Sequence, residues 1–295
     1  MKSKMITIGM PFYNAENYLK DAISSIINQD IKDWELILVN DGSTDRSLDV
    51  AKTFKDPRIK IFSDGDNKGL SSRLNQINEI AKFDLIARMD ADDISAPNRL
   101  SEQLKKLAQG NSDICFTAMA SIDKKNNFLG YRKPRDNTPT IYNLITGKHG
   151  INHATMLAKK SWLLRNKYNT EFKRSEDFEL WLRSINNKDF NVCFVTKPLY
   201  FYRESINTNI KSILKSYFYC MKAIFLHRKK TPTLFTMASI NIYIFKTIFM
   251  TILSKSMLKN SIINIRNRNL SPDLISGQNF IDSTIKEIQK IKKLP

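Results

Sequence analysis

The first 120 residues alternate between short apolar runs and segments in which apolar side chains recur every three or four positions. In one such segment Leu19, Ala22, Ile23, Ile26 and Ile27 fall on a single helical face. The apolar runs predict strands at Met5–Met10, Trp34–Val39, Ile59–Phe62, Asp84–Met89 and Ile114–Ser121. Regular alternation of strand and helix predicts βαβ units, and therefore an α/β fold whose mostly parallel sheet carries helices on both faces.

Polar residues follow three of these strands, and in open sheets of this kind ligands bind beyond the carboxyl ends of the strands. The strand ends read Pro11-Phe12-Tyr13-Asn14, Asn40-Asp41-Gly42-Ser43 and Met89-Asp90-Ala91-Asp92-Asp93. Asn14 is expected to cap the first helix, and Ser43 or Thr44 the second. The sequence has no G-x-G-x-x-G and no G-x-x-x-x-G-K-[ST] motif, which argues against dinucleotide-binding and P-loop sites.

The acidic cluster Asp90–Asp93 supports two interpretations. Carboxylates at positions i and i+2 after a strand can converge on one Mg²⁺ or Mn²⁺, because these cations prefer oxygen ligands. The same residues are also typical of a solvated turn that favours the dipole of the next helix. Two other segments, Asn67–Arg73 and Ser175–Trp181, offer an anion site and a carboxylate facing a cleft, or only the capped starts of helices.

The net charge of +18 is distributed unevenly along the chain. Residues 1–204 carry 32 basic and 26 acidic side chains, whereas residues 205–295 carry 15 and 3. We therefore expect a domain of residues 1–204 followed by a basic helical region of residues 205–295. Three scattered cysteines exclude a disulfide framework, and the N-terminus has no secretory signal, so a cytoplasmic location is expected.

The basic region contains a nearly apolar segment, Thr233–Leu253, which is long enough to cross a bilayer. Asn241 and Lys246 interrupt it, and a Lys at the centre of a spanning helix costs roughly 2.5–3.5 kcal/mol. We therefore favour an amphipathic helix lying in the membrane surface, since each nearby Lys or Arg adds on the order of 1 kcal/mol at an anionic leaflet. The alternative is a helical subdomain packed on the first domain with its basic face in water.

Five segments form an ordered set along the chain, namely PFYN at 11–14, NDGSTD at 40–45, NKGLSSRLN at 67–75, RMDADD at 88–93 and SEDFELW at 175–181. Taken together in this order, they resemble glycosyltransferase family 2. The resemblance implies the GT-A fold, a Rossmann-like α/β architecture with a nucleotide-binding part (1–120) and an acceptor-side part (121–204). The stretch IARMDADDISAPNRL further resembles the branch of bacterial exopolysaccharide transferases of the amylovoran type.

The resemblance also implies a role for each matching residue on the donor side. Asp41 would hydrogen-bond the nucleotide base, usually uracil, and Arg73 would lie beside the base or the diphosphate. Asp90 would contact the ribose or the donor sugar. The base pocket would be lined by Pro11, Phe12 and Tyr13. In this family the first position of the base motif is often Asp, and here it is Asn40.

On the reacting side, the resemblance makes Asp92 the ligand of a Mn²⁺ or Mg²⁺ that bridges the diphosphate, and Asp177 the catalytic base. Family members often carry a His after a Tyr-Arg pair near the domain's end, where this chain has Glu204, so Arg203 alone would meet the diphosphate. Supporting roles are possible for Asp93, Glu176 and His153, and a hydrogen-bonded structural role is an equal alternative for His153.

Together these features predict an inverting, metal-dependent hexosyltransferase in bacterial surface polysaccharide synthesis, of the capsule, exopolysaccharide or O-antigen kind. Its donor would be a nucleotide-diphosphate sugar such as a UDP-sugar, and its acceptor a glycan or lipid-linked oligosaccharide. The enzyme would be peripheral on the inner face of the cytoplasmic membrane and would bind no nucleic acid. Two alternatives stay open: a sugar-1-phosphate nucleotidyltransferase, and a non-enzymatic basic protein that binds membrane or nucleic acid.

Overall fold

The structure is a computed structural model that describes residues 5–134, 139–147, 149–204, 210–230, 233–254 and 274–291. Its strands are β1 (Ile6–Phe12), β2 (Trp34–Asn40), β3 (Ile59–Ser63), β4 (Leu85–Arg88), β5 (Ile94–Ser95), β6 (Ile114–Ile122), β7 (Phe128–Arg132), β8 (Leu157–Lys159) and β9 (Val192–Arg203). Its α-helices are α1 (Leu19–Ile27), α2 (Ser47–Lys52), α3 (Leu70–Ile80), α4 (Arg99–Ala108), α5 (Ile141–Thr146), α6 (Lys160–Arg165), α7 (Glu176–Asn186), α8 (Ile210–Leu226), α9 (Thr233–Ser254) and α11 (Leu274–Ile291).

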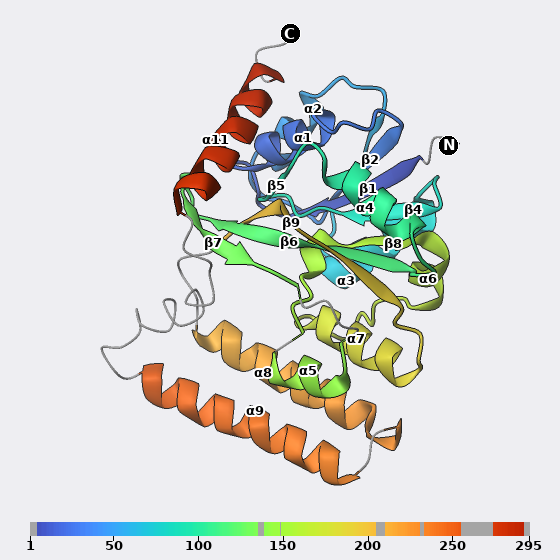
Figure 1. Ribbon diagram of the computed structural model, residues 1–295, viewed down its shortest axis with the longest axis vertical. Coiled ribbons are helices and arrows are strands. Elements are labelled where there is room, and N and C mark those ends of the chain that lie inside the picture. The colour runs from blue at the N-terminus through green and yellow to red at the C-terminus, as the bar shows by residue number, and fades with distance from the viewer. Residues whose placement is uncertain are drawn as a thin grey trace.

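The strands form one sheet in the order β3-β2-β1-β4-β8-β6-β9-β5, with β7 paired to β6 (Figure 1). The predicted βαβ units are the parallel half, β3-β2-β1-β4, in which Ile6 of β1 lies opposite both Trp34 of β2 and Leu85 of β4. The pairings of β8 with β4 and β6 are antiparallel, while β6 and β9 run parallel. The parallel half therefore places the ends of β1, β2 and β4 at one edge of the sheet.

Helices cover both faces of the sheet because successive side chains of a strand point to opposite faces. In β2, Leu36 and Leu38 join the core beneath α1 and α4, whereas Ile37 and Val39 join the core beneath α3 and α7. All four side chains are at most 1% exposed. A strand buried on both faces reads as a continuous apolar run, which is why β1 and β2 could be predicted within two residues.

The two predicted helix caps are wrong. Helix α1 begins at Leu19, and Asn14 instead adopts a left-handed conformation (φ 49°) in which its Oδ1 accepts a hydrogen bond from the amide of Thr44 (2.8 Å). Helix α2 begins at Ser47, and the carboxylate of Asp45 accepts the amide hydrogen of Ser47 (2.9 Å). The loops after β1 and β2 are thus bonded to each other, which fixes one wall of the space beyond the sheet.

The C-terminal helices pack on opposite sides of the sheet (Figure 1). Helices α8 and α9 lie along each other on the side of α7, where Phe178 meets the ring of Tyr243 edge-on at 5.9 Å. Helix α11 returns to the other face, where Phe280 packs edge-on against Phe201 at 5.4 Å.

Candidate active site

A pocket of about 300 Å³ opens beyond the ends of β1 and β4. Its lining residues are Pro11, Phe12, Tyr13, Asn14, Ala15, Tyr18, Leu70, Arg88, Asp90, Ala91 and Asp92. Five of them, Pro11, Phe12, Tyr13, Asp90 and Asp92, are residues that the sequence assigned to donor and metal binding. The pocket combines an aromatic wall with carboxylates, a composition suited to a planar base attached to charged groups.

Asp41 lies next to this pocket, since its amide donates to the carbonyl of Phe12 (2.8 Å). Its Oδ1 accepts hydrogen bonds from the amides of Lys68 (2.8 Å) and Gly69 (3.1 Å) and from Nε of Arg73 (2.9 Å). Asp41 is therefore held rigidly between two loops, and its contact with a nucleotide base stays a prediction.

Arg73 is only 1% exposed and joins Asp41 to Asp64, whose Oδ1 lies 2.6 Å from Nη2. Bonding to Arg73, and secondarily to Lys68, holds the pKa of Asp64 far below its usual range. The structure thus gives Arg73 protein carboxylates as partners, and it does not place Arg73 among the residues that line the pocket. Contact with a nucleotide stays a prediction for this residue, whereas its positioning of Asp41 is visible.

The first testable consequence is that Arg73→Met lowers the free energy of unfolding by about 3 kcal/mol. The substitution leaves the buried Asp41 carboxylate without its cation, while the partly exposed Asp64 recovers water and moderates the loss. Urea unfolding followed by circular dichroism measures the change. Arg46→Met is the matched control, because Arg46 is 84% exposed in its pair with Glu16. Equal losses from the two variants would contradict a buried network around Arg73.

Sequence reasoning missed Arg88, which lines the pocket and is 6% exposed. Its Nε and Nη2 lie 3.0 and 2.9 Å from Oδ1 of Asp90. Its Nη1 is buried and meets no acceptor in the described part of the chain. Burial alone would lower the pKa of Arg88. The interactions with Asp90, and then with Tyr168 and Glu176, have the larger effect, so the pKa is raised above its usual value. Arg88 is thus a fixed cation that orients Asp90 and carries a spare donor beside the pocket.

The Asp92 side chain is exposed at the pocket. Desolvation by the neighbouring protein, followed by the charge of Asp90, raises the pKa of Asp92 to about 6. A carboxylate in this setting is stabilised by a bound cation. In the part of the chain that the structure describes, no three or more His, Cys, Asp or Glu side chains form a cluster suited to a metal. Asp92 with Asp90 would suit a Mg²⁺ or Mn²⁺, whose remaining ligands phosphate and water would supply.

Asp93 and Arg203 support this loop from behind. Asp93 is 1% exposed, and its Oδ1 accepts the amide hydrogen of Arg203 (2.7 Å). The guanidinium of Arg203 donates to the backbone carbonyls of Asp92 and Asp123, both at 2.8 Å, and lies over the ring of Tyr18 at 4.4 Å. Arg203 therefore holds the backbone of Asp92 in place, and it is not among the residues that line the pocket, so its contact with a diphosphate stays a prediction.

Asp177 and Glu176 begin helix α7, directly after Ser175, which adopts a left-handed conformation (φ 55°). Such a conformation is uncommon for a residue other than glycine and frequently marks a functional turn. Ser175 does not cap the helix with its side chain, and its hydroxyl instead donates to the carbonyl of Ser216 on α8 (3.2 Å). Burial and the charge of Asp177 raise the pKa of Glu176, while Arg88 acts in the opposite direction. The acidic pair thus lies within electrostatic reach of the pocket without lining it.

His153 lies in surroundings that suit the hydrogen-bonded structural role, one of its two predicted alternatives. Its ring is 9% exposed, bonds Tyr168 Oη through Nε2 at 2.6 Å and meets the Trp181 ring edge-on at 5.6 Å. Burial, with a smaller contribution from Arg88, holds the pKa of His153 well below its usual value, so the ring is neutral. His153 packs behind the pocket among these aromatic side chains.

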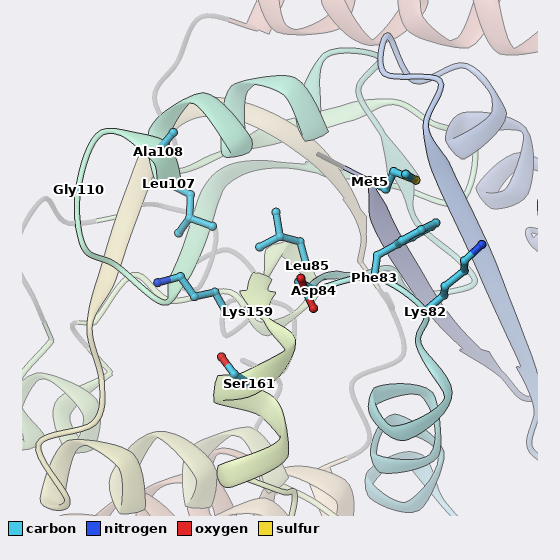
Figure 2. A pocket seen from close by; sticks show the side chains of 10 residues that line it. All are labelled: Met5, Lys82, Phe83, Asp84, Leu85, Leu107, Ala108, Gly110, Lys159 and Ser161. Carbon is cyan, nitrogen blue, oxygen red and sulfur yellow. The ribbon is translucent and has the colours of Figure 1, made fainter. Parts of the chain in front are cut away.

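A larger cavity, of about 800 Å³, lies at the opposite edge of the sheet (Figure 2). Residues that precede β1 and β4, such as Met5 and Asp84, line it together with Leu107 and Lys159. In parallel sheets ligands bind at the carboxyl edge, and this cavity is at the amino edge. It does not contain any of the candidate site residues.

Comparison with known proteins agrees with this geometry. Residues 7–166, more than half of the chain, match the family described as glycosyl transferase family 2. The chain belongs to this family. Family 2 membership makes it a glycosyltransferase and favours the first of the three functions that the sequence left open. The matched residues include the whole pocket and Arg73, while Asp177 and Arg203 follow the matched region.

Individual relatives extend the comparison. The uncharacterized glycosyltransferase MJ1057 of Methanocaldococcus jannaschii is 30% identical over 84% of this chain and 87% of its own length. An Escherichia coli protein named UDP-Glc:alpha-D-GlcNAc-diphosphoundecaprenol beta-1,3-glucosyltransferase WfgD is 27% identical over 71% of this chain and 82% of its own. The mannosyltransferase PcManGT from Pyrobaculum calidifontis, solved with GDP-Man and Mn²⁺, superimposes with a TM-score of 0.57 at 14% identity, over 98% of this chain and 88% of its own. The family 2 chain therefore has the GT-A fold.

Proposed function

We propose that this glycosyltransferase is inverting and metal-dependent, and that it transfers a sugar from a UDP-sugar to a glycan acceptor. The observation that carries the proposal is the pocket itself, in which Tyr13, Arg88, Asp90 and Asp92 meet at the carboxyl edge of parallel strands. The aromatic end suits a base, and the acidic end suits a metal-bound diphosphate. A UDP donor is supported by the name of the relative WfgD.

Asp92, with Asp90 beside it, would hold the Mn²⁺ or Mg²⁺. A structural neighbour of this fold was solved with Mn²⁺, which supports the assignment. A bound divalent cation would offset the negative charge that develops on the departing nucleoside diphosphate. The chain's own part is to orient this end of the donor, through Arg88 acting on Asp90 and through Arg203 acting on the backbone of Asp92.

Asp177 would take the proton from the acceptor hydroxyl. A hydroxyl is a poor nucleophile until a carboxylate accepts its proton, and such assistance contributes about 10²–10⁴-fold in rate. The hydroxyl oxygen bonds to the anomeric carbon as the bond to the diphosphate breaks, so a single displacement inverts the configuration at that carbon. Asp177 at the start of α7, near the pocket yet outside its lining, suits a group that acts on the acceptor.

The acceptor would be a lipid-linked oligosaccharide in bacterial surface polysaccharide synthesis. The relative WfgD, named for a diphosphoundecaprenol acceptor, and the O-antigen enzyme WbnJ of Escherichia coli, 32% identical over 62% of this chain and 72% of its own, support this pathway. An acceptor of this kind is anchored in a bilayer, so the enzyme would act as a peripheral protein on the cytoplasmic face of the membrane.

The experiment that tests the proposal measures release of nucleoside diphosphate from a panel of UDP- and GDP-sugars, with added Mn²⁺ or Mg²⁺ and with EDTA. We expect release from one or a few UDP-sugars, faster in the presence of acceptor lipid extract and lost with EDTA. Release that persists unchanged in EDTA would contradict metal dependence. Release from GDP-sugars alone would contradict the UDP assignment.

A further inference from the structure

The side of α9 that faces away from the protein is an apolar surface. Its large side chains recur at helical spacing and are between 43% and 82% exposed. We call this surface the α9 face and define it by Leu234, Met237, Ile244, Phe245, Ile248 and Phe249. Figure 1 shows α9 at the outer edge of the molecule, alongside α8. Such a concentration of exposed apolar residues is unusual for a protein surface in contact only with water.

Apart from Asn241, an uncharged residue that is exposed among the apolar side chains of this face, polar groups of α9 such as Lys246 are turned away from it or bonded within the helix. Lys246, the only charged residue of α9, is half-buried, and its Nζ donates to the carbonyl of Ile145 on α5 (3.2 Å). The hydroxyls of Ser239 and Thr247 donate to the carbonyls four residues earlier, at 2.7 and 2.8 Å. The α9 face can therefore enter an apolar environment without burying an unsatisfied charge.

The exposed residues of α8 are of a different kind. Along one side of this helix and the turn after it, Lys215, Phe218, Phe225 and Lys229 are all exposed. The sequence has no Asp or Glu anywhere in residues 205–272, although it has eleven Lys and Arg there. Aromatic side chains next to basic ones are the composition of a helix that lies at the boundary of an anionic bilayer.

We propose that the α9 face and the basic residues of α8 dock this protein on an anionic lipid bilayer, with α9 lying in the plane of the surface. The stretch Leu234–Thr251 has the length and composition to cross a membrane, but its other side packs on the protein through Tyr243 and Met250, which are 5% and 7% exposed. Crossing would require α9 to detach, whereas docking uses the face that is already exposed. A second copy is disfavoured as the occupant because two such basic hairpins would repel each other.

This docking places the start of helix α7, which carries the candidate base Asp177, near the membrane. Ser175, two residues before Asp177, bonds Ser216 of α8, and Phe178 packs on Tyr243 of α9. The α8–α9 hairpin is thus in direct contact with the start of α7, so a lipid-linked acceptor would reach Asp177 from the docked side. Only this last step rests on the proposed function, since docking itself requires no reaction.

The test measures how the full-length protein binds phosphatidylcholine vesicles with and without phosphatidylglycerol. We expect Phe245→Ser/Phe249→Ser to weaken binding to the anionic vesicles by roughly tenfold or more, because each buried ring carries a large transfer free energy. Ile80→Ser/Leu164→Ser is the matched control, since both residues are 39% exposed on other helices. Lys215→Gln/Lys229→Gln should weaken binding to anionic vesicles by roughly tenfold and leave binding to neutral ones unchanged.

Vesicle binding unchanged by the Phe245/Phe249 substitutions would overturn the proposal. So would a change from dimer to monomer in solution with no loss of vesicle binding, because the face would then be an interface between two copies. Nucleotide release with a water-soluble acceptor should be the same in Phe245→Ser/Phe249→Ser as in the wild type. Vesicle binding without any sugar transfer would contradict the proposed reaction and leave the docking intact.

Discussion

Replacing Asp177 by Asn is expected to lower kcat for sugar transfer by about 10²–10⁴-fold, the usual contribution of a general base. Asn is nearly the same size but cannot accept the hydroxyl proton. Nucleotide affinity should change little, because Asp177 does not line the donor pocket. Steady-state kinetics with acceptor, combined with calorimetric titration of UDP, separates the two effects.

Two further variants sharpen this test. Asp49→Asn makes the same chemical change at an exposed position of α2 and should leave kcat unchanged. Glu176→Gln separates the two members of the acidic pair, and we expect it to retain more activity than Asp177→Asn. Transfer by Asp177→Asn at the wild-type rate would exclude Asp177 as the base.

Replacing Asp92 by Asn should weaken the dependence of activity on the metal. A cation on the leaving diphosphate supplies several kcal/mol of charge stabilisation, so we expect kcat/KM to fall by roughly 10²-fold or more. The concentration of Mn²⁺ that gives half-maximal nucleotide release should rise in parallel. Asp92 is accessible from the pocket, whereas Asp93 is buried and its carboxylate bonds the amide of Arg203.

The comparison with Asp49→Asn again controls for a general effect of lost charge. Thermal unfolding without metal should show that Asp92→Asn is folded, since the side chain is exposed at the pocket and the substitution removes a charge that lies close to the carboxylate of Asp90. A variant whose metal titration matches that of the wild type would place the metal site elsewhere.

The sequence predicted the parallel half of the sheet well, for a physical reason. Strands such as β2 are buried on both faces, so they are continuous apolar runs between polar turns. The short strand β5 and the half-exposed β7 carry no such signal. Strand β9 runs through Pro198 to Arg203, and its register against β6 shifts on both sides of Ala118, the residue opposite Pro198.

The helix caps failed because tertiary contacts override local preference. Asn14, Ser43 and Thr44 have side chains that commonly cap helices, and the sequence does not show that the loops after β1 and β2 bond to each other. The structure shows that this cross-bonding fixes Asn14 beside the pocket instead.

In the candidate site, the residues that could be predicted from the sequence are those that follow the ends of strands. Asp90 and Asp92 follow β4 directly, so their convergence with Tyr13 could be expected from topology. Arg88 was missed because a single Arg at the end of an apolar strand resembles a solvated terminus. The partners of Arg73 and Arg203 could not be anticipated, since a sequence shows a cation without showing which carboxylates or carbonyls lie nearest in space.

The configuration of the newly formed glycosidic bond tests the central claim most directly, namely that one carboxylate assists a single displacement at this pocket. The measurement is the coupling constant of the anomeric proton in the NMR spectrum of the product made from an α-linked UDP-sugar. Our account predicts a β-linked product, formed by the wild type and lost in Asp177→Asn. An α-linked product would contradict it, because a single displacement on the face opposite the leaving diphosphate cannot retain the configuration.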